Sequence, residues 1–200
     1  MTNIKNFVKD QVAASAQVKE AFLADEKAMN TMAQVAGLLV NTYRAGGKSL
    51  WAGNGGSAAD AQHMAAELVN KFRLNRNGLP AMALTVDTSI LTAIGNDFGY
   101  DEVFYRQIIA CGMPGDIFIG ISTSGNSANL VRALDACREK DIRTVALVGE
   151  SACKMDDYDY VVHIPSKDTP RIQECQTLAG HILCDILERS FFGGEGFSLS

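Results

Sequence analysis

The sequence predicts an α/β protein whose parallel sheet is doubly wound, with helices on both faces and extra helices at the N-terminus. Three observations support this prediction. Short apolar runs alternate with stretches of helical length from residue 48 onward. Two helical stretches precede the first of these runs. The chain has 200 residues, which is enough to bury a sizeable core.

The elements follow from the pattern of apolar residues. Apolar side chains recur at helical spacing over residues 3–24 and 28–45, and two glycines then end the second stretch. Short apolar runs predict strands at 48–53, 81–86, 116–121, 143–149 and 159–164. Amphipathic stretches predict helices at 57–72, 101–112, 127–140 and 170–192.

The chain contains no low-complexity linker or internal repeat, so residues 1–200 are expected to form one domain. Within it, residues 1–45 are expected to be helices that pack across the sandwich or against a second subunit. Residues 46–192 would hold the α/β core and the C-terminal helix, and residues 193–200 a flexible tail.

Charge and hydropathy exclude several classes of function. The net charge of −5 and the pI near 5.2 argue against a nucleic-acid binder, which would need a basic surface. No apolar run approaches the roughly 20 residues needed to cross a bilayer, and the N-terminus does not read as a signal peptide. The five cysteines form no CxxC pair, as expected of reduced thiols. A cytoplasmic protein is expected.

Ligands of such a sheet bind outside the carboxyl ends of its strands, so the strand-to-helix turns are the places to examine. The turn STSGNS follows the apolar run 116–121 and offers four hydroxyls in six residues. Hydroxyls and free backbone N–H groups at a helix N-terminus bind anions. No lysine follows, so a sugar phosphate is expected rather than a nucleoside triphosphate. The hydroxyls belong to Ser122, Thr123, Ser124 and Ser127.

The turn GNGGS follows the first predicted strand. Its glycines do not match the GxGxxG spacing of dinucleotide-binding loops. They are expected to let a small substrate approach Asn54 and the backbone of Gly55 and Gly56, with Ser57 capping the next helix. A third polar loop, IGNDFGYDE, offers Asn96 and Asp97, for which turn chemistry and substrate contact weigh equally.

A metal or acid–base site is suggested by two helical segments. His63 and Glu67 lie four residues apart and share one helical face. His181 interrupts an apolar stripe on the C-terminal helix, and Gln173 precedes it by eight residues. Two histidines, a carboxylate and an amide suit zinc. Three alternatives stay open: a capped helix with a core histidine, a metal site, and acid–base chemistry without metal.

Taken together, these motifs resemble the sugar isomerase (SIS) domain family, a flavodoxin-like or Rossmann-like fold, and within it the bacterial phosphoheptose isomerases. The resemblance covers nearly the whole chain. It rests on GNGGSAADAQH with AAEL, on LTAIGNDFG, on GISTSGNSANL, and on RIQE followed by His181. It implies conversion of D-sedoheptulose 7-phosphate to D-glycero-D-manno-heptose 7-phosphate, the first step toward heptose for lipopolysaccharide or other surface glycans. It also implies a homotetramer with active sites at subunit interfaces.

Carried over by residue, the resemblance implies one zinc ion per subunit, bound by His63, Glu67, Gln173 and His181. Glu67 would be the catalytic base and His181 the catalytic acid. A neutral imidazole has one lone pair, so the acid role of His181 requires a labile zinc bond. The resemblance also implies substrate contacts at Asn54, Gly55, Gly56, Ser57, Glu67, Asn96, Asp97, Ser122, Thr123, Ser124, Ser127 and Gln173.

Two positions depart from the family pattern. Lys71 stands where the family often has arginine, and Gln176 where it usually has histidine, so neither position is assigned a role. The main rival is a non-catalytic SIS adaptor that binds the replication initiator; its pattern lacks the acidic residue at 67 and the histidine at 181. Sugar-phosphate-sensing regulators would carry a DNA-binding module, and none is evident. Arabinose 5-phosphate isomerases fit the HxxxE helix less well.

Overall fold

The computed structural model describes residues 3–193 and is built on a five-stranded parallel sheet. The strand order β2-β1-β3-β4-β5 is that of flavodoxin-like doubly wound folds. The predicted α/β sheet is therefore confirmed. The tail predicted at 193–200 lies, apart from Gly193, outside the described residues. The strands are β1 (Ser49–Gly53), β2 (Ala81–Ala83), β3 (Ile117–Ile121), β4 (Arg143–Val148) and β5 (Tyr160–His163).

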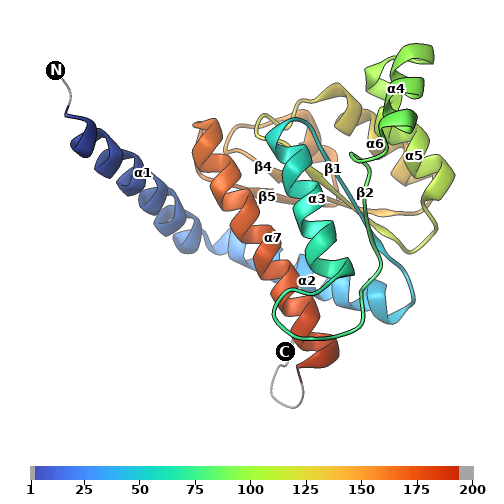
Figure 1. Cartoon of the computed structure of the whole chain (residues 1–200), viewed down its shortest axis with the longest axis horizontal. Coiled ribbons are helices and arrows are strands. Elements are labelled where there is room, and N and C mark those ends of the chain that lie inside the picture. The colour runs from blue at the N-terminus through green and yellow to red at the C-terminus, as the bar shows by residue number, and fades with distance from the viewer. Residues whose placement is uncertain (1–2, 194–200) are drawn as a thin grey trace.

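Helices cover both faces of this sheet (Figure 1). On one face lie α2 (Glu26–Arg44), α3 (Gly56–Val69) and α7 (Thr169–Phe192). On the other lie α5 (Val103–Cys111) and α6 (Ala128–Glu139). Successive residues of β1 alternate between these cores: Leu50 packs with α5 and α6, Trp51 with α2, α3 and α7. Every residue of β1 and β3 is buried, as a parallel sheet covered on both faces requires.

The two N-terminal helices differ in what they bury. α2 packs into the core beside α7 and β5. α1 (Ile4–Ala24) buries only Phe22 and extends away from the body of the molecule (Figure 1). Its packing against a second subunit stays a prediction. Five large apolar side chains of α1 are more than half exposed: Ile4, Phe7, Val8, Val12 and Leu23.

The structure corrects the prediction in the segment after β2. The predicted strand 81–86 ends at Ala83, and a helix that the sequence analysis missed, α4 (Thr88–Asp97), follows. The side chain of Asp87 caps it by accepting a hydrogen bond from the N–H of Ile90 (2.9 Å). The predicted polar loop IGNDFGYDE is therefore wrong in part, because Asn96 and Asp97 end this helix. Two 3₁₀ helices were also missed, η1 (Tyr100–Glu102) and η2 (Lys154–Asp157).

The end of α3 differs from the prediction as well. The expected helix ran to residue 72, but α3 ends at Val69. The chain then turns back, and the guanidinium of Arg76 donates hydrogen bonds to the carbonyls of Glu67 and Leu68. A side chain that binds the last carbonyls of a helix favours its termination there. Between residues 3 and 193, no helix combines the length and the apolar composition needed to cross a membrane.

A buried hydrogen-bond network at the start of β1 generates a stability prediction. Trp51 Nε1 donates to Ser49 Oγ (2.8 Å), and Tyr43 Oη lies 2.7 Å from the same oxygen. Ser49→Ala leaves the buried indole N–H without its partner, which costs about 1–3 kcal/mol. We expect equilibrium urea denaturation to show this loss in the free energy of unfolding. The exposed control Ser151→Ala should stay within about 0.5 kcal/mol of wild type; equal stability of the two variants would contradict the assignment.

Candidate active site

Two loops flank the point where the strand order reverses. The glycine loop, Gly53–Ser57, follows β1, and the serine loop, Ser122–Ser127, follows the neighbouring strand β3. The helices that continue from them, α3 and α6, pack on opposite faces of the sheet. A crevice at the carboxyl ends of two such strands is where open α/β sheets bind ligands. The sequence analysis placed the site at this edge from the same two loops.

The glycine loop brings the backbone close to side chains of other elements. Gly55 has a φ of +56°, a conformation that residues with a side chain rarely adopt. A Cβ added at Gly56 would lie 2.5 Å from Nε2 of Gln173, so a side chain there would displace that amide. The loop therefore requires glycine at Gly55 for its backbone conformation, and Gly56 lets the Gln173 amide lie against the loop.

Ser57 does not cap α3, so that prediction is wrong. The N-cap is Gly55, because its positive φ starts the helix two residues earlier than expected, and Ser57 lies buried within the first turn. Asn54 is held by protein groups: its side chain exchanges two 2.9 Å hydrogen bonds with Asn129 and accepts one from the hydroxyl of Tyr100 (3.2 Å). These bonds fix the orientation of the Asn54 amide.

The serine loop presents hydroxyls at the N-terminus of α6. Ser127 is the N-cap, but its side chain makes no capping hydrogen bond; its Oγ lies 3.3 Å from Ser122 Oγ. Ser122 Oγ also accepts a hydrogen bond from the N–H of Gly125, whose φ is +62°. Ser124 is exposed and Thr123 half-buried. A helix N-terminus with hydroxyl groups around it suits an anion such as phosphate.

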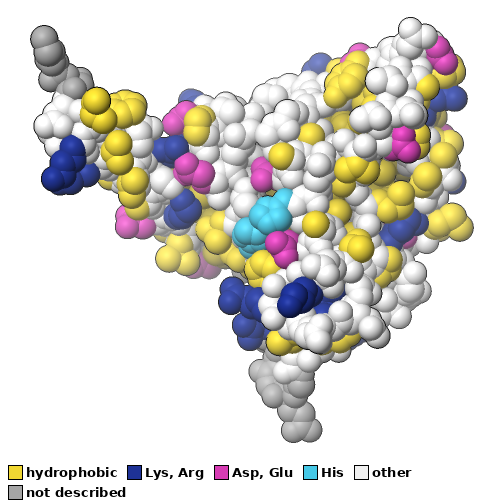
Figure 2. Space-filling model, in the orientation of Figure 1, with side chains coloured by type: hydrophobic (Ala, Val, Ile, Leu, Met, Phe, Trp, Pro, Cys, Tyr) yellow, Lys and Arg dark blue, Asp and Glu magenta, His cyan; other side chains and the backbone are white. Residues whose placement is uncertain are grey.

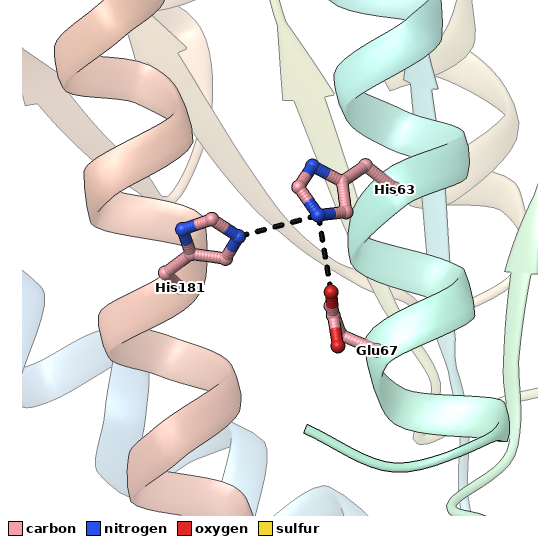
Figure 3. A group of neighbouring side chains, drawn as sticks. All are labelled: His63, Glu67 and His181. Carbon is pink, nitrogen blue, oxygen red and sulfur yellow. Dashed lines mark hydrogen bonds and ion pairs between the residues drawn. The ribbon is translucent and has the colours of Figure 1, made fainter. Parts of the chain in front are cut away.

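The strongest cluster of chemically active side chains lies between α3 and α7. His63 Nε2 is 3.0 Å from Glu67 Oε1 and 3.4 Å from His181 Nε2 (Figure 3). The ligand atoms of these three residues all lie within 4.8 Å of one another. The two histidines form a patch at the surface in the middle of one face of the molecule, next to acidic side chains (Figure 2). The structure thus brings together three of the four predicted metal ligands.

The two helices meet in register because both start at the carboxyl edge of the sheet and run in the same direction. Thr177 Oγ1 donates a hydrogen bond to Asp60 Oδ1 (2.8 Å), one turn before the histidine pair. A Cβ at Gly180 would overlap the side chain of Met64, so glycine permits the close approach of α7 to α3. This approach is what places His63 and His181 within reach of one ion.

Burial shifts the pKa of two groups in this cluster. Burial, followed by the charge of His63, holds the pKa of His181 below its ordinary value. His181 is therefore neutral at neutral pH and offers a lone pair to a metal. Burial raises the pKa of Asp60, against the opposing effects of the Thr177 hydrogen bond and of the two histidines.

Gln173 is separated from the other predicted metal ligands. Its amide packs against Gly56 in the first turn of α3, whereas His181 faces His63 about two turns further along both helices. Gln173 therefore borders the glycine loop of its own chain. In this position its amide is suited to a small polar ligand bound at that loop.

Asn96 and Asp97 lie exposed at the end of α4, where the Asn96 amide donates to the Asp97 carboxylate (2.8 Å). Within residues 3–193, no hydrogen bond links either side chain to the histidine cluster or to the two loops. The nearby Tyr100 does reach the glycine loop through Asn54 (3.2 Å). Asn96 and Asp97 therefore lie at the end of α4, close in sequence to Tyr100, and their side chains make no hydrogen bond to the two loops or to the histidine cluster in the described part of the chain.

The donor set fits a zinc ion. Two imidazole nitrogens and a carboxylate oxygen are ligands that zinc accepts, and three protein ligands leave a position for water or substrate. Glu67 uses Oε1 toward His63, and among the described residues no hydrogen bond reaches its Oε2. One carboxylate can therefore serve the cluster and still present an oxygen to a ligand.

Several residues around the cluster escaped the sequence analysis. Asp60 stands three residues before His63, so helical spacing could have indicated it. Phe72, whose ring stacks on His181 with centroids 5.4 Å apart, lies in a loop and has no periodic signal. The buried Gln176, left without a role, donates to the carbonyls of Ser122 (3.3 Å) and Leu147 (2.8 Å) beneath the serine loop.

Lys71 is exposed, and the structure gives it no partner that would explain the departure from arginine. His163 lies 2.8 Å from the carbonyl of Gly149 through Nδ1 and pairs with Asp156 through Nε2 (3.1 Å). His163 therefore links the end of β5 to the residue after β4 and to η2.

Comparison with known proteins agrees with this fold and identifies the family. Residues 12–149 match the model of the SIS domain family. The chain is 53% identical to a phosphoheptose isomerase of Aneurinibacillus thermoaerophilus, over 98% of this chain and 100% of that one. It is 49% identical to phosphoheptose isomerase 2 of Campylobacter jejuni, over 99% and 98% of the two chains.

Solved structures show the same similarity. A phosphoheptose isomerase from Francisella tularensis superimposes with a TM-score of 0.89 at 34% identity, covering 94% of this chain and all of that one. The enzyme of the same name from Neisseria gonorrhoeae gives a TM-score of 0.86 at 41% identity, covering 93% and 99%. The chain belongs to the SIS domain family and, within it, to the phosphoheptose isomerases.

Proposed function

We propose that this protein is an aldose–ketose isomerase that converts D-sedoheptulose 7-phosphate to D-glycero-D-manno-heptose 7-phosphate, for the synthesis of surface-glycan heptose. The observation that carries the proposal is the convergence of His63, Glu67 and His181 at one point between α3 and α7. The names of the relatives support the substrate class. They give no support to the alternative of a replication-initiator adaptor, and the chain keeps Glu67 and His181.

In this proposal, each of the two loops binds a different part of the substrate. The serine loop receives the phosphate with the hydroxyls of Ser122, Thr123, Ser124 and Ser127 and the N-terminus of α6. The glycine loop receives the sugar, with Asn54, Gly55, Gly56, Ser57 and Gln173 close to its hydroxyls. Asn96 and Asp97 would reach the substrate from the end of α4. This binding arrangement requires neither a contact to a nucleotide base nor a nucleotide phosphate.

The reaction moves a proton between the two carbons that exchange carbonyl and hydroxyl. Glu67 takes the proton from C1 of the ketose, and His181, in its protonated form and not bound to a metal at that moment, donates a proton to the carbonyl oxygen at C2, which gives an enediol. Glu67 then returns its proton to C2, and the hydroxyl proton at O1 passes back to His181, leaving the aldehyde at C1. Each residue ends the cycle in its starting state.

We propose that His63, Glu67 and His181 bind one zinc ion per subunit. When bound, zinc would stabilise negative charge on the substrate oxygens. The position of Gln173 at Gly56 supports a substrate contact within its own chain, so a role as fourth ligand would need the Gln173 of a neighbouring subunit. A homotetramer with interfacial sites is part of the proposal, supported by the exposed apolar face of α1.

A panel of sugar phosphates tests the substrate. In a coupled assay, we expect the protein to isomerise sedoheptulose 7-phosphate with a kcat/KM at least about 100-fold above that for arabinose 5-phosphate or fructose 6-phosphate, because a shorter sugar would leave some of the proposed hydrogen-bonding groups unpaired. Comparable activity on a pentose phosphate would reassign the substrate. No activity on any sugar phosphate would refute the isomerase.

Two substitutions test the acid–base roles. Glu67→Gln and His181→Gln should each lower kcat by at least about 100-fold, because a positioned acid or base contributes about 10²–10⁴. The matched controls Glu150→Gln and His163→Gln alter the same residue types away from the cluster and should keep activity. Full activity in either site variant, with its oligomeric state unchanged in size-exclusion chromatography, would overturn the assigned roles.

A further inference from the structure

A buried ion pair lies beneath the active site and belongs to none of its predicted residues. Arg76 in the loop after α3 and Glu188 on α7 pair through Nε and Oε1 at 2.9 Å, and each side chain is 1% exposed. The carboxylate of Glu188 also accepts hydrogen bonds from three consecutive backbone N–H groups, at 3.0, 2.7 and 2.9 Å. These belong to Phe72, Arg73 and Leu74. Burial alone would raise the pKa of Glu188, but these donors hold it below its ordinary value.

The arginine half of the pair reaches the main chain of the proposed base. Arg76 Nη2 donates to the carbonyl of Glu67 (2.9 Å), and Nη1 to that of Leu68 (2.7 Å). These are carbonyls of the last turn of α3, which have no partner within the helix. The guanidinium therefore fixes the backbone from which the Glu67 carboxylate extends toward His63.

The glutamate half of the pair reaches the proposed acid through an aromatic ring. Because Glu188 holds the N–H of Phe72, it sets where that ring lies. The ring stacks on His181, with centroids 5.4 Å apart and planes inclined by 29°. His63 meets His181 on another side, edge-on, at 4.8 Å and 85°. The imidazole of His181 is thus confined between one ring from the loop and one from α3.

We propose that the Arg76–Glu188 pair is a positioning device for the active site, which fixes Glu67 through its carbonyl and His181 through Phe72. This inference rests on the proposed isomerase function for its kinetic consequence, and on the geometry alone for its structural one. The pair joins α3, the following loop and α7, the three segments that meet at the cluster. Besides each other, the two side chains bond seven backbone groups: the three N–H groups on Glu188 and four carbonyls on Arg76. The four carbonyls include those of Asn70 (3.4 Å) and Asn77 (3.0 Å), which accept from Nη1.

A second ion pair, with a buried carboxylate, offers a matched control at the amino ends of the strands. Lys48 Nζ lies 2.6 Å from Asp116 Oδ2, and the carboxylate also accepts from the N–H groups of Lys48 and Met113. Asp116 is 2% exposed and directly precedes β3, so it lies at the amino ends of the strands, away from the cluster. Removing its charge should affect stability without affecting the geometry of the site.

The kinetic test compares Glu188→Gln with Asp116→Asn at a temperature where circular dichroism shows both variants folded. The glutamine replaces one accepting oxygen with an NH₂ group that cannot accept. We expect kcat of Glu188→Gln on sedoheptulose 7-phosphate to fall by about 10- to 100-fold, as small displacements of catalytic groups do, with KM changed by less than about twofold. Asp116→Asn should keep kcat within about twofold of wild type.

A second variant and a spectroscopic readout separate positioning from folding and from the proposed function. Phe72→Leu leaves the ion pair intact and removes only the ring over His181. The chain has only three histidines, so their ring protons can be assigned by NMR. In the protein as purified, the Hε1 proton of His181 should be shifted by the ring current of Phe72. That shift should be lost in Phe72→Leu and altered in Glu188→Gln, but kept in Asp116→Asn.

Each outcome decides one point. A folded Glu188→Gln with wild-type kcat, or a His181 resonance indifferent to Phe72→Leu and Glu188→Gln, would overturn the positioning role. An equal loss of kcat in Glu188→Gln and Asp116→Asn would also overturn it, because it would show a general effect of stability. If wild type is inactive on the sugar phosphate while the His181 shifts respond as expected, the proposed function fails and the positioning role stands.

Discussion

The close, in-register packing of α3 against α7 is the constraint on which the active site depends. Each helix supplies only part of the cluster, so neither His63 with Glu67 nor His181 alone can hold an ion. Gly180 has no side chain to keep the helices apart, and the hydrogen bond between Thr177 and Asp60 (2.8 Å) holds the two helices in register. The sheet provides the orientation: strands β1 and β5 are parallel, so the helices that follow them start at one edge and run side by side (Figure 1).

The same geometry separates binding from chemistry along one edge of the sheet. α3 begins in the glycine loop, where backbone lies open to a ligand, and carries His63 about two turns further on. The serine loop stands beside it on the neighbouring strand, with its hydroxyls at the N-terminus of α6. In the proposed mechanism, the loops that hold the phosphorylated sugar do not exchange protons, whereas the proposed base and acid come from the helices.

The sheet could be predicted from the sequence more completely than the site. Apolar periodicity and turn residues were sufficient for the five strands, and helical spacing brought His63 and Glu67 to one face. The family resemblance assigned His181 to the site, which the sequence pattern alone had left open between a core histidine, a metal ligand and an acid. α4 was missed because a short, half-exposed strand and a helix without buried residues leave a weak pattern. Phe72, Arg76 and Glu188 could not be found, since their contacts join residues more than 100 positions apart and depend on how α3 and α7 pack.

X-ray absorption at the zinc edge tests the central claim most directly, on protein purified without chelator and analysed for metal content. The account predicts one zinc per chain, coordinated by nitrogen and oxygen at about 2.0–2.2 Å, with the histidine contribution reduced in His181→Gln. Sulfur at about 2.3 Å would instead place the ion at one of the five cysteines. Such a spectrum, or stoichiometric absence of zinc with activity insensitive to chelation, would contradict a metal site between α3 and α7.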